Sequence, residues 1–172
     1  MLILESNFLE ITNILSGKVI QTIPITIPEG FTLSEIARTL NNKGIINNKS
    51  GFINYVQNQA KITFSSLNFI ENIPTNNLEG YLFPDTYYFS KNTSYKDIVT
   101  SFLNRFKSVV EKEYKSSSLQ YLTLHEIVTL ASIIEKEAAS TKEMPIISGV
   151  FHNRLNKNML LESCPTVGYA MG

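Results

Sequence analysis

The sequence predicts an α+β fold, in which a small α+β module in residues 1–62 precedes a mainly helical region in residues 63–172. Two patterns support this prediction. Apolar residues alternate along residues 19–27, which is typical of a strand. Several other segments carry apolar residues at intervals of three and four, which indicates amphipathic helices.

The composition excludes several classes of protein. The chain of 172 residues has 15 basic and 15 acidic residues, so it shows no basic surface for nucleic acid. Its single cysteine, Cys164, and its two histidines argue against a disulfide framework and a zinc site, and we expect neither a metal nor a cofactor. No apolar run approaches the ~20 residues that span a bilayer, and no signal peptide begins the chain. A chain made as written is therefore expected in the cytoplasm.

The first module is predicted to contain one strand and three helices. A short helix covers residues 1–17 and ends at Gly17, and the strand over residues 19–27 ends at Pro28. After a turn at Gly30, Thr32 or Ser34 begins a helix through residues 33–40, and another helix covers residues 49–60.

An aromatic segment follows this module. Residues 63–77, which are rich in Asn and Ser, predict an irregular connection to residues 78–89, LEGYLFPDTYYF. Aromatic rings stack on sugar faces and carboxylates accept hydrogen bonds from hydroxyls, so residues 78–89 suit a sugar-binding cleft. The alternative is that their aromatic side chains anchor the core, and both interpretations can hold: these side chains are Tyr81, Phe83, Tyr87 and Phe89.

Three further helices are predicted, over residues 95–114, 123–139 and 142–156. The last of them admits Pro145 in its first turn. Its expected buried stripe consists of Met144, Ile147, Phe151 and Leu155.

The helix over residues 123–139 carries two candidate catalytic acids. Thr123 and Glu126 form a capping-box pattern at its start, and apolar residues over most of its circumference predict a mostly buried helix. Glu137 follows large apolar residues on the wheel, whereas Glu135 follows Ala131 and a serine. We therefore expect the carboxyl of Glu137 to lie in a cleft, where apolar surroundings favour a proton donor. The alternative is an ordinary solvated last turn.

Four motifs together carry a resemblance to a known family. They are LEGYLFPDTY (78–87), LASIIEKEA (130–138), ISGVFHNRL (147–155) and PTVGYAMG (165–172). In this order and spacing they resemble the YceG-like family, the membrane-anchored endolytic murein transglycosylases, once described as aminodeoxychorismate lyases. The resemblance covers almost the whole chain from about residue 17.

The resemblance implies a lyase that cuts the MurNAc–GlcNAc β-1,4 bond of peptidoglycan without water and leaves a 1,6-anhydro-MurNAc end. One carboxyl can serve as acid and then as base in such a reaction, and the motif places this role on Glu137. The motifs also imply substrate-binding or supporting positions, with a purely structural role as the open alternative for each: Glu79, Tyr81, Asp85, Asn153 and Arg154.

The same resemblance implies the surroundings in which the protein works. Residues 24–60 are similar to LysM folds, and the expected partners are peptidoglycan glycan strands and cell-wall synthesis proteins. Family members are anchored in the inner membrane, with the catalytic part facing the periplasm or the cell exterior.

The chain departs from the family pattern near its end. Cys164 stands where family members have an acid, and Asn158, Leu160 and Gly168 are also atypical. The family has a membrane helix before this region and further catalytic chain after it, so the chain is expected to be a truncated member. Residues 1–172 alone are therefore expected to be inactive and marginally stable.

Two other functions remain as alternatives. One is a non-catalytic glycan-binding or scaffold protein that keeps the fold without turnover. The other is a pyridoxal-phosphate lyase, which the sequence disfavours because no lysine accompanies a glycine-rich anion-binding loop.

Overall fold

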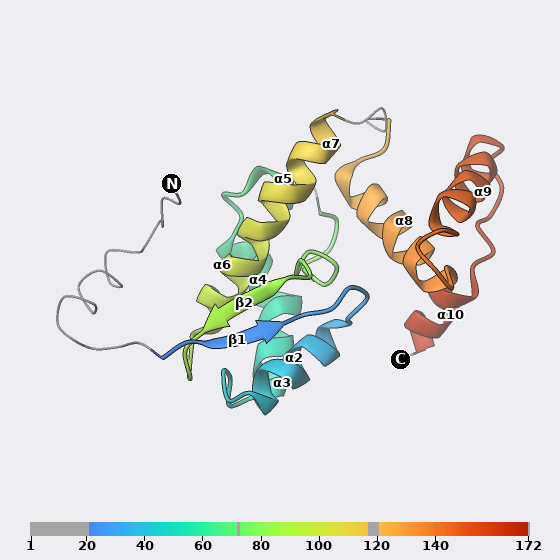
Figure 1. Ribbon diagram of the computed structural model, residues 1–172. Helices are drawn as coiled ribbons and strands as arrows, with labels where there is room; N and C mark the ends of the chain where they lie inside the picture. Colours follow the sequence, from blue (N-terminus) through green and yellow to red (C-terminus); the bar gives the residue numbers. More distant parts are fainter. Residues whose placement is uncertain (1–20, 72, 117–120, 172) are drawn as a thin grey trace, which may run out of the picture.

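The structure, a computed structural model, describes residues 21–71, 73–116 and 121–171. Residues 21–116 form a body around a small sheet, and three helices in residues 124–171 gather beside it (Figure 1). The predicted helix over residues 1–17 lies outside the described residues. The α+β fold class is confirmed by the mixture of helices with one antiparallel sheet.

The sheet joins two strands that lie far apart in the sequence. β1 (Ile23–Thr26) pairs antiparallel with β2 (Thr86–Phe89), with Ile23 opposite Phe89. The predicted strand is confirmed over residues 23–26. β2 was not predicted as a strand. Its pairing begins beside Asp85, whose carbonyl oxygen accepts a 2.9 Å hydrogen bond from the Ile27 amide, so its conformation depends on a distant partner.

The helices of the body follow the predicted apolar periodicity. Thr32 begins the first helix through a capping box with Glu35, in which each side chain accepts a hydrogen bond from the backbone amide of the other residue. The irregular connection predicted over residues 63–77 was wrong in one part, because a short helix, α5, forms there. The elements are α2 (Leu33–Asn42), α3 (Lys49–Asn54), η1 (Tyr55–Gln59), α4 (Ala60–Thr63), α5 (Asn68–Glu71), α6 (Tyr95–Phe106), η2 (Lys107–Glu111) and α7 (Lys112–Ser116).

One hydrophobic core fills the body. Tyr87 of β2 packs on Phe102 of α6, with ring centroids 4.3 Å apart. The alternative that the aromatic segment anchors the core is confirmed for its buried members, Tyr81, Tyr87 and Phe89, whereas Phe83 is half-buried. Residues before and after position 62 share this core. The division of the chain into domains at that position stays a prediction.

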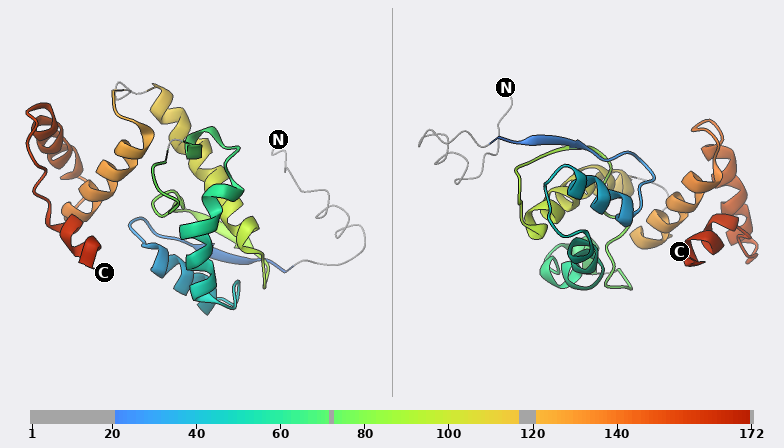
Figure 2. Two further views of the ribbon diagram at one scale, coloured as in Figure 1. Left: turned by 180° about the vertical axis from the view of Figure 1, so that it is seen from behind. Right: turned by 90° about the horizontal axis from the view of Figure 1, so that it is seen from below.

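Three helices follow the body: α8 (Leu124–Glu137), α9 (Met144–Asn156) and α10 (Cys164–Met171). The capping box that begins α8 at Thr123 and the proline in the first turn of α9 are confirmed. α10 was not predicted as a helix. Figure 2 shows from two further directions that the three helices lie together beside the body.

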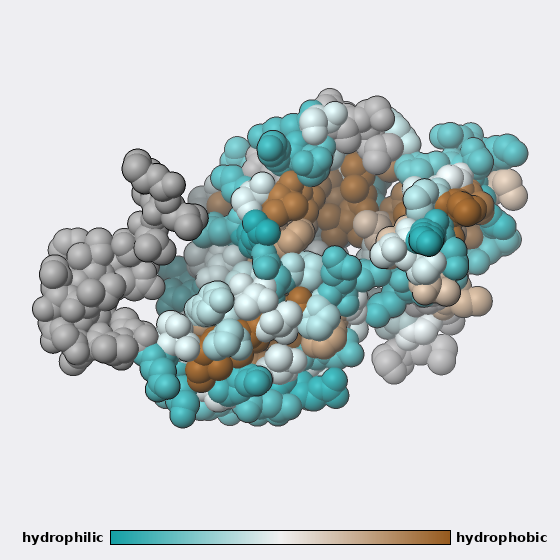
Figure 3. Space-filling view, in the orientation of Figure 1, coloured by the Kyte–Doolittle hydropathy of each residue, from teal (hydrophilic) through white to brown (hydrophobic). Residues whose placement is uncertain are grey.

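The predicted burial of α8 was wrong, and the buried stripe predicted for α9 is confirmed for Phe151, whereas Met144 and Ile147 are half-buried. Leu130 is the only buried side chain recorded in α8 and Phe151 the only one in α9, although Leu124 and Val128 pack partly on the core. Leu155, assigned to a buried stripe, is 39% exposed, and Leu160 is 80% exposed. Figure 3 shows apolar surface over this region. Periodicity shows which side chains share a face, but it does not show whether another element covers that face.

Within the described ranges, no helix combines the length and apolar character that crossing a membrane requires.

Candidate active site at the end of α8

Glu137 is the last residue of α8, and the chain becomes extended at the next residue, Ala138 (φ −76°, ψ 127°). Its Oε1 accepts a hydrogen bond of 2.6 Å from the hydroxyl of Ser163. Ser163 directly precedes α10 and is only 6% exposed. A short hydrogen bond from a buried hydroxyl gives the carboxylate a defined orientation.

The exposure of the two helix-end glutamates differs from the prediction. Glu137 is exposed and Glu135 is half-buried, which is the reverse of the order of burial that the helical wheel predicted. The position of Glu137 in a cleft stays a prediction. Glu135 packs against the turn at Gly30, where an added Cβ would lie 3.0 Å from its Oε1. Lys136 also holds this turn, because its Nζ donates to the Gly30 carbonyl oxygen at 2.9 Å. The N-terminal part of the body thus contacts the turn of α8 that carries Glu137.

Glu79 connects the body to α10. Its Oε1 accepts a 2.7 Å hydrogen bond from the backbone amide of Leu33, in the first turn of α2, where a negative charge is favoured by the helix dipole. Its Oε2 accepts a 2.8 Å hydrogen bond from the hydroxyl of Tyr169 in α10. Both carboxylate oxygens therefore have partners, which suits a positioning role.

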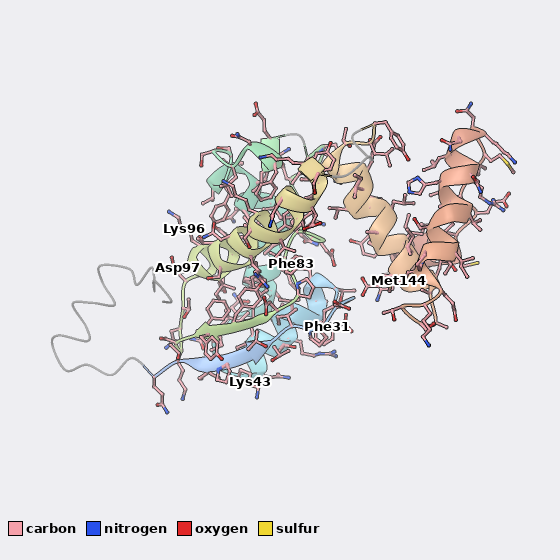
Figure 4. The ribbon with its side chains drawn as sticks, turned by 45° about the horizontal axis from the view of Figure 1, so that its top comes forward. Phe31, Lys43, Phe83, Lys96, Asp97 and Met144 are labelled. Carbon is pink, nitrogen blue, oxygen red and sulfur yellow. The ribbon has the colours of Figure 1, made fainter. Side chains whose placement is uncertain are left out.

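α10 brings the two carboxylates into one region. Ser163, at its start, holds Glu137, and Tyr169, near its end, holds Glu79. These two residues are six positions apart, which corresponds to roughly 9 Å along a helix axis at 1.5 Å per residue. Figure 4 shows Phe31, next to the Gly30 turn, on the side of the body toward Met144 at the start of α9.

Tyr81 is a core residue. It is 2% exposed and packs against Phe69 and Phe106. Burial raises the pKa of its hydroxyl to about 12, so Tyr81 stays protonated at physiological pH. Its hydroxyl forms a 2.8 Å hydrogen bond with Nδ1 of His125 in α8, which gives a second polar link between the body and this helix.

Asp85 supports the start of β2. Its Oδ1 accepts a 2.7 Å hydrogen bond from the Thr86 amide, and its Oδ2 pairs with Arg105 of α6. The backbone bond from Thr86 and the Arg105 guanidinium hold the pKa of this carboxyl below its ordinary value. The Arg105 guanidinium also lies 5.8 Å from the ring centroid of Phe83.

Arg154 organises the connection from α9 to α10. Its Nη1 donates to the carbonyl oxygen of Leu160 at 2.9 Å and to Oε2 of Glu162 at 2.7 Å. This connection carries Ser163 to Glu137. Asn153, the other candidate on α9, has an exposed side chain.

An apolar groove of about 280 Å³ lies between α8 and α9, but Glu137 is not among the residues that line it. The groove lies along the earlier turns of α8, and its one carboxyl, Glu126, is bound to Thr123 in the capping box. The groove is lined by Leu122, His125, Glu126, Thr129, Leu130, Ile133, Leu155 and Leu161. Among the described residues, no group of His, Cys, Asp and Glu side chains could hold a metal ion.

Sequence reasoning missed Ser163 and Tyr169 as partners of the candidate carboxylates. Both lie in or beside the last of the four motifs, so motif position was the signal that could have found them. Their roles depend on contacts with residues 26 and 90 positions away in the chain. No local pattern reports contacts over such distances.

Comparison with known proteins defines the class of protein. The profile of the YceG-like family matches residues 4–172, and the chain therefore belongs to this family. It is similar to a crystal structure of a YceG-like protein from Listeria monocytogenes, with a TM-score of 0.77 and 28% identity. That similarity covers 98% of this chain and 59% of the solved chain.

Two relatives carry the name endolytic murein transglycosylase. The protein of Streptococcus pneumoniae serotype 2 strain D39 is 34% identical over 161 residues, which cover 86% of this chain and 29% of the relative. The protein of Bacillus subtilis strain 168 is 34% identical over 171 residues, which cover 94% of this chain and 47% of the relative. The chain thus spans less than half the length of either relative.

Proposed function

We propose that the protein is an endolytic peptidoglycan lytic transglycosylase, with Glu137 as its general acid and base. The observation that carries this proposal is the hydrogen bond by which buried Ser163 orients the Glu137 carboxyl at the exposed end of α8. An exposed carboxyl with a defined orientation is available to a long glycan strand. The type of reaction is taken from the name of the two relatives, endolytic murein transglycosylase.

In the proposed reaction, protonated Glu137 gives its proton to the glycosidic oxygen between MurNAc and GlcNAc. The bond from MurNAc C1 to this oxygen breaks, and GlcNAc leaves with a hydroxyl group. The C6 hydroxyl of MurNAc then attacks C1 and gives its proton to the Glu137 carboxylate. The products are a 1,6-anhydro-MurNAc end and the original acid form of Glu137, and no water is consumed.

The contacts of the other candidate residues separate one that is available to the glycan from four that support the fold of the site. We propose that Asn153 contacts the glycan, because its side chain is exposed. Glu79 and Arg154 act through positions that they support, since each bridges α10 or the connection leading to it. Tyr81 and Asp85 support α8 and β2 in the same indirect way.

We propose peptidoglycan glycan strands as the substrate and cell-wall synthesis proteins as partners. The site of action would be the outer side of the cytoplasmic membrane, because the glycan strands are there. A LysM-like role of residues 24–60 in binding these strands is part of the same proposal, and it rests on analogy of fold.

The test is to incubate the natural gene product that contains these residues with purified peptidoglycan. Lytic transglycosylase activity gives products with 1,6-anhydro-MurNAc ends, which mass spectrometry separates from hydrolysis products. Glu137→Gln is expected to fold normally and to lose at least about a hundred-fold in rate, because the amide cannot exchange a proton with the substrate.

Glu113→Gln is the matched control, since it makes the same substitution at an exposed position on α7. It should form anhydro ends at the unaltered rate. Undiminished product from Glu137→Gln would assign the chemistry to another residue. Glycan binding without any anhydro product from the unaltered protein would favour a binding or scaffold function instead.

A further inference from the structure

Ser163 has a distinctive environment. Within residues 21–71, 73–116 and 121–171, it is the one side chain recorded as buried that is neither apolar nor aromatic, at 6% exposure. A serine just before a helix commonly accepts a hydrogen bond from a backbone amide of the first turn. Here its hydroxyl donates to Oε1 of Glu137 at 2.6 Å, while its carbonyl oxygen accepts a 2.7 Å bond from the Thr166 hydroxyl.

The segment before Ser163 is held in a defined conformation. Asn158 and Glu162 both have positive φ, at 54° and 55°, a region that is unfavourable for residues other than glycine. Arg154 supports this conformation, because it binds Glu162 and the Leu160 carbonyl oxygen. The structure thus maintains an unfavourable backbone directly before the residue that contacts Glu137.

We propose that Ser163 is a positioning residue that directs the catalytic proton to Oε2 of Glu137. The hydroxyl of Ser163 has one hydrogen, and it is donated to Oε1. The proton of the acid form then occupies Oε2, the oxygen left available to the glycosidic oxygen. The same oxygen accepts the proton of the C6 hydroxyl in the second step, so the orientation serves both halves of the reaction.

This inference rests on the proposed function, but it predicts effects that a simple structural link would not produce. Loss of the Ser163 donor leaves the Glu137 carboxyl free to turn and to present its proton away from the glycosidic oxygen. Ser163→Ala should therefore lower kcat by about ten- to a hundred-fold with little change in KM.

Two other variants complete the kinetic test. Ser163→Thr keeps the hydroxyl and should restore most of the lost kcat. Ser132→Ala removes an exposed hydroxyl from α8 that donates to the Thr129 carbonyl oxygen, and it should behave as the unaltered protein. All three variants keep the neighbouring residues Glu135, Lys136 and Cys164. A difference in rate between the variants therefore does not come from these neighbours.

A second measurement separates this inference from the proposed function. Crystal structures of the variants should show the Glu137 carboxyl in one orientation in the unaltered protein and in Ser163→Thr, and in more than one orientation in Ser163→Ala. This readout needs no turnover, so it tests the coupling of the two residues even if no anhydro product forms. A single, unaltered orientation of the carboxyl in Ser163→Ala would overturn the inference. Kinetics in which Ser163→Ala matches Ser132→Ala, or in which Ser163→Thr gives no rescue, would overturn it as well.

Discussion

Tyr81 and His125 illustrate how one side chain can serve both the core and the site. The Tyr81 ring lies in the core, while its hydroxyl reaches His125 in the first turn of α8. The same pair of residue types recurs on the surface, where the Tyr121 hydroxyl bonds Nδ1 of His152 at 3.0 Å. Tyr121 is 64% exposed, so water can replace its partner.

This contrast predicts unequal effects of two identical substitutions. Tyr81→Phe should lower the free energy of unfolding by about 1–2 kcal/mol, because it leaves a half-buried His125 nitrogen without its partner. Tyr121→Phe should change it by less than about 0.5 kcal/mol. Denaturant unfolding of the two variants measures the difference. Equal effects would mean that the Tyr81 bond adds nothing to the attachment of α8.

The turn between β1 and α2 and the end of α8 depend on each other. Gly30 has a φ of +72°, and its turn receives both Glu135 and Lys136. Gly44, after α2, has a similar φ of +69°, but an added Cβ there would meet nothing within 4 Å. The two glycines therefore share a backbone requirement and differ in what surrounds them.

Gly30→Ala and Gly44→Ala should each destabilise the protein by about 1 kcal/mol, because positive φ is unfavourable for alanine. Only Gly30→Ala should also displace Glu135 and loosen the last turn of α8. Hydrogen exchange of the amides in residues 134–138 measures this loosening. Equal exchange in the two variants would show that the Gly30 turn does not hold the turn that carries Glu137.

The body and the three following helices differ in how much apolar surface they bury. Phe102 and Leu103 of α6 are fully buried, whereas α8 and α9 have one buried residue each. At roughly 25 cal/mol per Å² of apolar surface, this difference gives the body most of the hydrophobic stabilisation. Polar links, such as those from Glu79, Lys136 and Tyr81, then carry much of the attachment of the helices to the body.

We therefore predict that α8, α9 and α10 open at lower free energy than the body. In native-state hydrogen exchange of residues 1–172, amides of these helices should exchange well before those of α6. The prediction fails if α8 is protected as strongly as α6, in a single cooperative transition.

Local patterns in the sequence determined several helices and their starts, although not α5 or α10. Caps at Thr32 and Thr123, and Pro145 in the first turn of α9, act between residues a few positions apart, so they can be identified without a fold. The same is true of Glu137 as a candidate acid, which the wheel and the motif both indicated. Its role stays a prediction that the proposed experiments test.

Tertiary structure alone decided the pairing of β1 with β2, the exposure of Glu137 and the partners of both candidate carboxylates. Ser163 reaches Glu137, and Tyr169 reaches Glu79, only because the α10 region contacts both the end of α8 and the body. The apolar residues of α8 predicted burial, yet Leu130 is the one residue of that helix that the neighbouring elements bury fully. Helical periodicity follows from contacts between residues three and four positions apart. The burial of a helix face and the hydrogen-bond partners of the two carboxylates follow from contacts between distant segments of the chain.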